Sequence, residues 1–115
     1  MINLKTKSNP LVSIIVPCYN GEDTIAETMK SIFDQDYDPI EIIIVNDGST
    51  DHSLTVINTY CERKTNVAII SQDNQGLSSA RNTGLAHAKG EFVISVDADD
   101  ILKSGIIVEL LNPHL

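Results

Sequence analysis

Four short apolar runs, rich in β-branched residues and almost free of polar interruptions, are the feature that most constrains this chain of 115 residues. They are Val12–Val16, Glu41–Val45, Val67–Ile70 and Phe92–Val96. A strand with one face in water alternates apolar and polar residues, whereas a continuous apolar run is typical of a strand buried on both faces. The four runs therefore predict a parallel sheet that is covered on both sides.

Segments with helical periodicity separate these runs. In the first segment, four apolar residues between Ile25 and Phe33 fall on one face of a helix, and similar patterns follow the other three runs. Strands that alternate with helices predict an α/β fold with a Rossmann-like, mostly parallel sheet and flanking helices. We expect residues 1–10 to form a flexible leader and residues 11–115 to form one domain.

The charge of the chain limits what it can bind. It has 16 Asp+Glu against 8 Lys+Arg, a formal net charge of −8, so it lacks the positive field that nucleic acid and anionic membranes require. A phosphate compound would need local groups or a bridging cation. The two cysteines, and the lack of an apolar run near the roughly 20 residues of a membrane span, predict a cytoplasmic protein. A longer form could attach peripherally to the inner face of a membrane.

Three carboxylates within four residues follow the fourth apolar run. The carboxyl ends of parallel strands meet at one edge of a sheet, where α/β proteins bind ligands. On an extended segment, residues two positions apart point to the same side, so Asp97 and Asp99 could share a hard divalent cation, Mg²⁺ or Mn²⁺. The alternative is a turn in which Asp99 or Asp100 caps the next helix.

Two residues at the same edge suit a nucleobase. Asp47 follows the second run, and its carboxylate could accept a hydrogen bond from N3–H of uracil, where cytosine has an acceptor. It could equally cap a helix that begins near Thr50. Tyr19 could stack on a base or cover the core at its rim. Glu22, which follows Tyr19, could cap the first helix or touch a ligand.

Arg81 is one of two arginines in the chain and lies in the third predicted helix. It is a candidate for binding a diphosphate or for pairing with Asp97 or Asp99, and the sequence does not separate these roles. The loop before this helix contains neither GxxxxGK[ST] nor GxGxxG. It is therefore not a phosphate loop of either kind.

From about Val12 to Leu111, the chain resembles the nucleotide-binding part of family 2 glycosyltransferases. The motifs that carry the resemblance are Val12–Asn20, Ile44–Asp51, Asn74–Gly76 with Ala80–Gly84, and Asp97–Asp100. The resemblance implies a GT-A fold that binds a nucleoside-diphosphate sugar, most often a UDP-sugar, together with Mn²⁺ or Mg²⁺. It also implies inverting transfer of the sugar to an acceptor hydroxyl in polysaccharide or glycoconjugate synthesis.

The resemblance further implies roles for residues on the base side of the site. Pro17 and Tyr19 would flank the uracil, with Tyr19 stacked on it. Asp47 would accept from uracil N3, Asn74 would lie at the edge of the base, and Glu22 would lie beside the nucleoside.

On the phosphate side, the resemblance implies that Arg81 approaches the diphosphate or the sugar. Asp97 would reach the ribose or sugar and share the cation that Asp99 binds. In the family, the general base and the acceptor-binding part follow this segment. We therefore expect a donor-binding fragment with no catalytic base in this chain and little activity alone, whose saccharide or glycolipid acceptor binds the missing half. An exposed sheet edge could favour self-association.

Three other classes of protein share parts of this pattern. A receiver-type signalling domain needs an acidic pair after the first strand, and a phosphatase of the haloacid dehalogenase type needs its nucleophilic Asp there. The segment Pro17–Asn20 contains no acid, and the carboxylates follow the fourth run. A non-catalytic nucleotide-binding module with the same fold is the third alternative.

Overall fold

The structure is a computed structural model that describes residues 9–115. Strands and helices alternate as predicted: β1 (Val12–Cys18), α1 (Ile25–Phe33), β2 (Ile40–Asp47), α2 (Ser53–Cys61), β3 (Val67–Gln72), α3 (Leu77–His87), β4 (Phe92–Ser95), α4 (Ile106–Leu111) and a short 3-10 turn, η1 (Asn112–His114). All strand pairs of the four-stranded sheet are parallel. The predicted fold class is confirmed. The predicted leader, apart from Asn9 and Pro10, lies outside the described residues.

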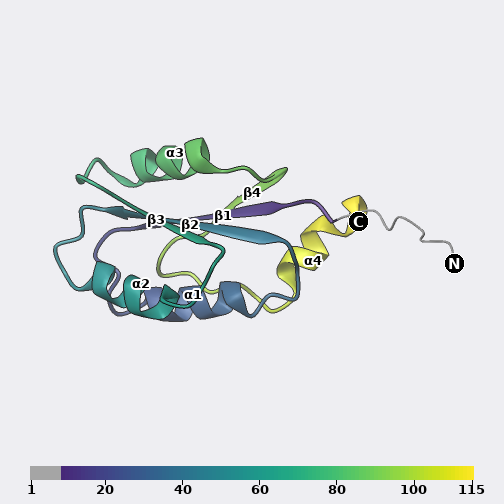
Figure 1. Cartoon of the computed structure of the whole chain (residues 1–115), viewed down its shortest axis with the longest axis horizontal. Helices are drawn as coiled ribbons and strands as arrows, with labels where there is room; N and C mark the ends of the chain where they lie inside the picture. The colour runs from purple at the N-terminus through teal and green to yellow at the C-terminus, as the bar shows by residue number, and fades with distance from the viewer. Residues whose placement is uncertain (1–8) are drawn as a thin grey trace, which may run out of the picture.

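Helices cover both faces of the sheet (Figure 1). Helix α3 lies on one face, and α1 and α2 lie on the other. The larger core cluster packs β1 and β2 against α1, α2 and α4. Alternate side chains of β2 point to the other face, where the smaller cluster contains Ile43, Val45 and Ala80. Gly84 lets α3 approach β1 closely, because a Cβ atom there would lie 2.3 Å from Cγ2 of Ile15.

The strand order β3-β2-β1-β4 determines where a ligand can enter. The chain builds outward from β1 through β2 to β3, and then returns to place β4 on the other side of β1. Such a reversal leaves a crevice outside the carboxyl ends of the two strands that flank it, the usual ligand site of open α/β sheets. Here those strands are β1 and β4.

Pro17 lies at this crevice, one residue beyond the run Val12–Val16 that we predicted as a strand. It remains part of β1 and is paired with Val45 of β2. The carbonyl of Ile15 accepts a hydrogen bond of 2.8 Å from Val96 on the β4 side. Two residues later, the backbone nitrogen of Pro17 faces the same side. Because β4 has already ended at Ser95, the missing N–H breaks no ladder hydrogen bond there.

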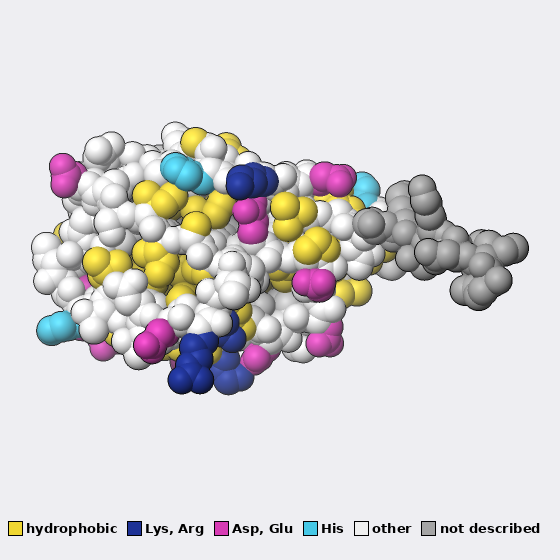
Figure 2. Space-filling model, in the orientation of Figure 1, with side chains coloured by type: hydrophobic (Ala, Val, Ile, Leu, Met, Phe, Trp, Pro, Cys, Tyr) yellow, Lys and Arg dark blue, Asp and Glu magenta, His cyan; other side chains and the backbone are white. Residues whose placement is uncertain are grey.

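The surface carries both the acidic charge and some apolar side chains. In Figure 2, carboxylates are spread over the visible face, Lys and Arg appear in few places, and apolar side chains show between α3 and the helices of the opposite layer. β4 is an edge strand, and its Val93 is 40% exposed. Self-association through a sheet edge stays a prediction.

Cys18 and Cys61 are both buried and form no disulfide. Within the described residues, no helix has the length and apolar character needed to cross a membrane.

Candidate functional site

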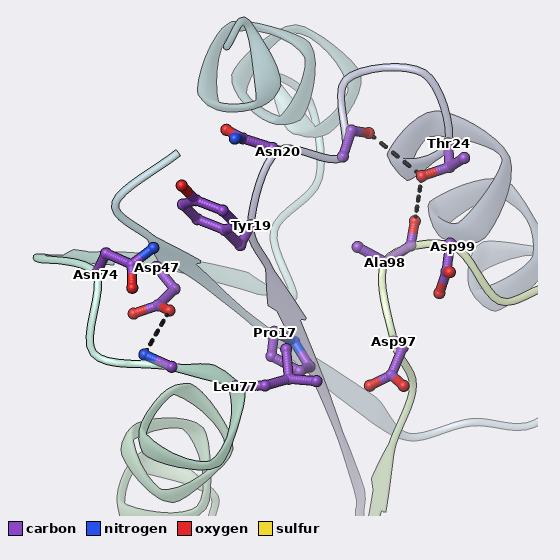
Figure 3. A pocket seen from close by; sticks show the side chains of 12 residues that line it. Pro17, Tyr19, Asn20, Thr24, Asp47, Asn74, Leu77, Asp97, Ala98 and Asp99 are labelled. Atoms are coloured by element: carbon purple, nitrogen blue, oxygen red, sulfur yellow. Dashed lines mark hydrogen bonds between the residues drawn. The ribbon is translucent and has the colours of Figure 1, made fainter. Parts of the chain in front are cut away.

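A pocket of about 540 Å³ lies at the crevice (Figure 3). It is formed by the ends of β1, β2 and β4 and by the loop before α3. Its lining residues are Pro17, Tyr19, Asn20, Gly21, Thr24, Asp47, Asn74, Gly76, Leu77, Asp97, Ala98 and Asp99. All the site residues predicted from the sequence are among them except Glu22 and Arg81.

Asp47, at the end of β2, is 1% exposed and holds the loop between β3 and α3. Its Oδ1 accepts hydrogen bonds from Gln72 Nε2 (2.9 Å) and from the backbone N–H of Gln75 (3.0 Å), and its Oδ2 accepts from the N–H of Gly76 (3.0 Å). Burial raises the pKa of Asp47, but these three hydrogen bonds lower it further, so the pKa lies below the ordinary value for aspartate. Asp47 is therefore an ionised acceptor fixed before any ligand arrives. It does not cap α2, the alternative that the sequence left open.

Backbone geometry behind Asp47 keeps the same loop close. Gly48 has φ +68°, and a Cβ atom there would lie 2.5 Å from the backbone nitrogen of Asn74. A glycine is therefore needed both for the left-handed turn and for the contact. Gln72, which donates to Asp47, is itself held because its Oε1 accepts from the hydroxyl of Thr83 at 2.6 Å. Through Thr83 and Gln72, α3 thus helps to hold the carboxylate in place.

Tyr19 lies at the open mouth of the pocket. In Figure 3, Tyr19, Asp47 and Asn74 lie together at one side, and Pro17 and Leu77 lie below them. The tyrosine is 46% exposed, and Leu77 is 41% exposed. Tyr19 therefore does not cover the core, and its ring is available to a planar ligand between the ends of β1 and β2.

Glu22 connects two loops, and it does not line the pocket. Its Oε2 accepts from the backbone N–H of His52 (3.1 Å) and contacts His52 Nδ1 (3.0 Å) at the start of α2. The backbone N–H of Glu22 in turn donates to Asp51 at 3.1 Å. The neighbouring Asn20, at φ 50°, accepts from the N–H of Thr50 at 2.8 Å. The loops that follow β1 and β2 are thus joined by hydrogen bonds between side chains of each loop and the backbone of the other.

Three carboxylates gather where β4 ends. Oxygen atoms of Asp97, Asp99 and Asp100 all lie within 4.8 Å of one another, and Asp99 and Asp100 are exposed. Arg81 Nη2 donates to Asp97 Oδ1 at 3.0 Å, with both side chains roughly two-fifths exposed. Of the two roles open to Arg81, the pairing with Asp97 is thus observed. A set of hard oxygen donors with excess negative charge fits a divalent cation such as Mg²⁺ or Mn²⁺.

Several residues of the site were missed by sequence reasoning. Gly21, Thr24, Leu77 and Ala98 line the pocket although none carries a charge. Thr24 and Ala98 are connected by a hydrogen bond that spans 74 positions of the sequence. Thr24 lies at the start of α1, at the end of the loop that follows β1, and Ala98 lies in the segment that follows β4. Their places in these two connections were the only signal that could have pointed to them.

Comparison with known proteins identifies the family of the chain. The glycosyl transferase family 2 model matches residues 13–114. The chain belongs to glycosyltransferase family 2. A curated relative of this family 2 chain, the uncharacterised glycosyltransferase EpsJ of Bacillus subtilis, is 46% identical over 101 residues, which is 88% of this chain and 29% of EpsJ.

Solved structures agree with this assignment. S. aureus TarS 1–349 in complex with UDP-GlcNAc matches with a TM-score of 0.81 and 34% identity, over 90% of this chain and 31% of TarS 1–349. The mannosyltransferase PcManGT from Pyrobaculum calidifontis, in complex with GDP-Man and Mn²⁺, matches with a TM-score of 0.79 and 32% identity, over 84% of this chain and 30% of PcManGT. The family 2 chain thus has the GT-A nucleotide-sugar-binding fold and spans about a third of the length of these proteins.

Proposed function

We propose that this chain binds the donor of an inverting glycosyltransferase, a UDP-sugar held together with a divalent cation. One pocket combines two features that support this function. The first is the buried carboxylate of Asp47, and the second is the pair Asp97 and Asp99 on the opposite side, which forms a cluster with Asp100. The first suits an N–H on the edge of a base, and the second suits a cation that bridges a diphosphate. The pocket therefore offers complementary groups to both ends of a nucleoside diphosphate.

On the base side, we propose that Tyr19 stacks on the uracil above Pro17 and that Asn74 lies at the edge of the ring. Protein donors occupy three acceptor positions of Asp47, and a carboxylate has about four. The remaining position suits N3–H of uracil, whereas cytosine would present an acceptor there. Guanine also carries a ring N–H, and PcManGT binds GDP-Man, so GDP is the relevant competitor.

On the phosphate side, we propose that Asp99 and Asp97 hold the cation and that Arg81, besides pairing with Asp97, approaches the diphosphate or the sugar. When bound, Mn²⁺ or Mg²⁺ would neutralise negative charge on the departing diphosphate. A chain with a net charge of −8 needs such a cation because its own field repels the donor. Glu22 is not part of the proposed contacts, since its carboxylate is engaged by His52.

The remaining steps of the transfer belong to the whole protein. The acceptor hydroxyl must lose its proton to a general base as it attacks the sugar, and we assign no such base among residues 9–115. This chain covers 29% of EpsJ. We propose that the base and the saccharide or glycolipid acceptor site belong to the additional length of such relatives. The two free cysteines fit a reducing compartment such as the cytoplasm.

Calorimetric titration of UDP, with Mn²⁺ and then with EDTA, tests the donor site, and CDP and GDP serve as matched nucleotides. We expect UDP to bind more tightly with Mn²⁺, and CDP to bind weakly under both conditions. Asp99→Ala should weaken the binding of UDP by about tenfold or more in Mn²⁺, and its effect should disappear in EDTA. Asp47→Asn should weaken the binding of UDP in both buffers, because an amide nitrogen replaces one acceptor oxygen.

Three results would contradict the proposal in different ways. A folded chain that binds no nucleotide with Mn²⁺ would favour a module that lacks donor binding. Equal affinity for CDP and UDP would remove Asp47 from base recognition. Preference for GDP would keep the site and the cation but change the donor.

A further inference from the structure

A line of polar residues runs along α1 on the side that faces the segment after β4. Thr24 is the N-cap of α1, Thr28 and Ser31 lie within it, and Gln35 follows its end. Their spacing of four, three and four positions places them along one side of the helix and its ends. Thr28 is 0% exposed and Gln35 is 8% exposed. Buried polar groups in proteins almost always have hydrogen-bond partners, and the partners of this line lie some 70 positions further along the chain.

The first two members of the line bind the same atom. The carbonyl oxygen of Ala98 accepts from the hydroxyl of Thr24 at 2.8 Å and from the hydroxyl of Thr28 at 2.9 Å (Figure 3 shows the contact of Thr24). Each hydroxyl has one proton and one other acceptor in reach, the carbonyl of Gly21 at 3.4 Å or that of Thr24 at 3.3 Å. The shorter distances assign both protons to Ala98, whose two lone pairs are then both occupied.

The last two members hold the backbone further along. Ser31 Oγ accepts from the N–H of Leu102 at 2.9 Å. Gln35 donates to the carbonyl of Lys103 at 2.9 Å and accepts from the N–H of Ile107 at 3.3 Å. The segment between β4 and α4 contains no helix or strand. Hydrogen bonds with these side chains therefore hold its backbone in place, as the regular backbone hydrogen bonds do within a helix or strand.

Ala98 lies between the two carboxylates assigned to the cation. Three like charges within 4.8 Å repel one another. The segment is not extended as we expected from the sequence, but forms a turn closed by a hydrogen bond of 3.0 Å from the N–H of Asp100 to the carbonyl of Asp97. The hydroxyls of Thr24 and Thr28 attach this turn to α1. We propose that Thr24 and Thr28 are positioning residues that fix the peptide of Ala98 and thereby aim Asp97 and Asp99 at the cation. This inference rests on the proposed function, because it presumes that the carboxylates bind a cation with the donor.

Isosteric substitutions separate positioning from simple packing. Valine has the shape of threonine without its hydroxyl, and serine keeps the hydroxyl without the methyl group. The doubly substituted chain Thr24→Val/Thr28→Val therefore loses both hydrogen bonds to Ala98, and Thr24→Ser/Thr28→Ser retains them. Ser31→Ala is the matched control, since it removes a bond of the same line at Leu102, beyond the carboxylates.

Two affinities are measured on the whole chain. The affinity for Mn²⁺ in the presence of UDP is obtained from the electron paramagnetic resonance signal of free Mn²⁺. The affinity for uridine in EDTA is obtained by chemical-shift titration. We expect the double valine variant to bind Mn²⁺ about tenfold more weakly, the scale found when an indirect partner of a metal ligand is lost. Uridine should bind as it does to the wild type, because Asp47 lies on the other side of the pocket. The double serine variant and Ser31→Ala should both bind Mn²⁺ almost as well as the wild type.

Other results would overturn the inference. A folded double valine variant with wild-type affinity for Mn²⁺ would show that the hydroxyls only stabilise the fold, as would equal losses of Mn²⁺ and uridine binding. If the double valine variant does not fold, Thr24→Val, at a half-buried position, is measured against Thr24→Ser in the same way. A wild-type chain that binds uridine but no Mn²⁺ would overturn both this inference and the proposed cation site.

Discussion

The two sides of the pocket are built differently, although both stand at the ends of strands of one sheet. On the side of β2, Asp47 is buried, and three of its acceptor positions are occupied by Gln72 at the end of β3 and by the loop before α3. On the side of β4, Asp99 and Asp100 are exposed, and only Asp97 has an ion-pair partner among the described residues, Arg81. On the first side, groups of the protein itself surround and hydrogen-bond the carboxylate. On the second side, three carboxylates lie together, and a single arginine neutralises part of their charge.

This difference separates structural from ligand-dependent carboxylates. A buried carboxylate that accepts several hydrogen bonds stabilises the folded state. Exposed carboxylates close to one another contribute little stability and are better matched to a cation. Loss of a carboxylate should therefore affect folding on one side and cation binding on the other.

The largest effect should come from Asp47→Ala. The substitution leaves the N–H groups of Gln75 and Gly76 without an acceptor, and we expect the free energy of unfolding to fall by about 2–3 kcal/mol. Asp97→Ala is the matched change on the other side, and it removes only a half-exposed ion pair, worth less than about 1 kcal/mol. Urea denaturation of both variants in EDTA measures the difference. Similar losses in the two variants would contradict the contrast between the two sides.

Gly48→Ala should lower the free energy of unfolding by straining the backbone next to Asp47. Its φ of +68° disfavours any side chain, and its Cβ atom would meet the backbone nitrogen of Asn74 at 2.5 Å. Gly105→Ala provides a control, since Gly105 has φ +77° but nothing within 4 Å of a Cβ atom. We expect a loss of about 1 kcal/mol for the control and clearly more for Gly48→Ala. Equal melting temperatures would show that the loop moves aside freely.

Much of this architecture could be predicted from the sequence. The sheet and its helices followed from four apolar runs and the helical periodicity between them, because burial on two faces is a local pattern. The pocket followed from the rule that ligands bind at the carboxyl ends of parallel strands. Tyr19, Asp47, Asn74 and Asp99 lie in that pocket, and their roles toward a ligand stay predictions.

The remainder depended on contacts between distant parts of the chain. The carboxylate of Glu22 contacts His52, 30 positions away, which the sequence did not predict. The role of Glu22 beside the nucleoside stays a prediction. Thr28 carried no charge and matched no motif, and its partner, Ala98, is 70 positions away. Every residue has a backbone carbonyl, so the residue type at position 98 does not show that its carbonyl accepts a hydrogen bond. Neither periodicity nor spacing could therefore reveal this contact.

Acid should lower the free energy of unfolding in part through protonation of Asp47, by less than the substitutions above. In the unfolded chain Asp47 takes up a proton near its ordinary pKa, about 3.9, whereas its pKa in the folded protein is lower. The stability that its ionised form contributes is therefore fully present above the ordinary pKa and is lost as the pH falls through the folded pKa. Asp47→Asn does not titrate, so its free energy of unfolding should fall less steeply with acid than that of the wild type. Asp51 and Glu41, whose pKa values are also lowered, are present in both proteins and cancel in the difference.

The smallest effect should have the opposite sign. Asp99→Asn removes one of three carboxylates within 4.8 Å, so in EDTA we expect it to raise the free energy of unfolding by about 0.5 kcal/mol or less, the usual range of surface substitutions. Asp36→Asn, at an exposed position outside the cluster, corrects for the lower net charge. With Mn²⁺ and UDP the order should reverse, because ligand binding stabilises the wild type by mass action and the variant has a neutral amide in place of a charged ligand for the cation. If Asp99→Asn were less stable than the control in EDTA, the cluster would be part of the folding core, and the two sides of the pocket would not differ as proposed.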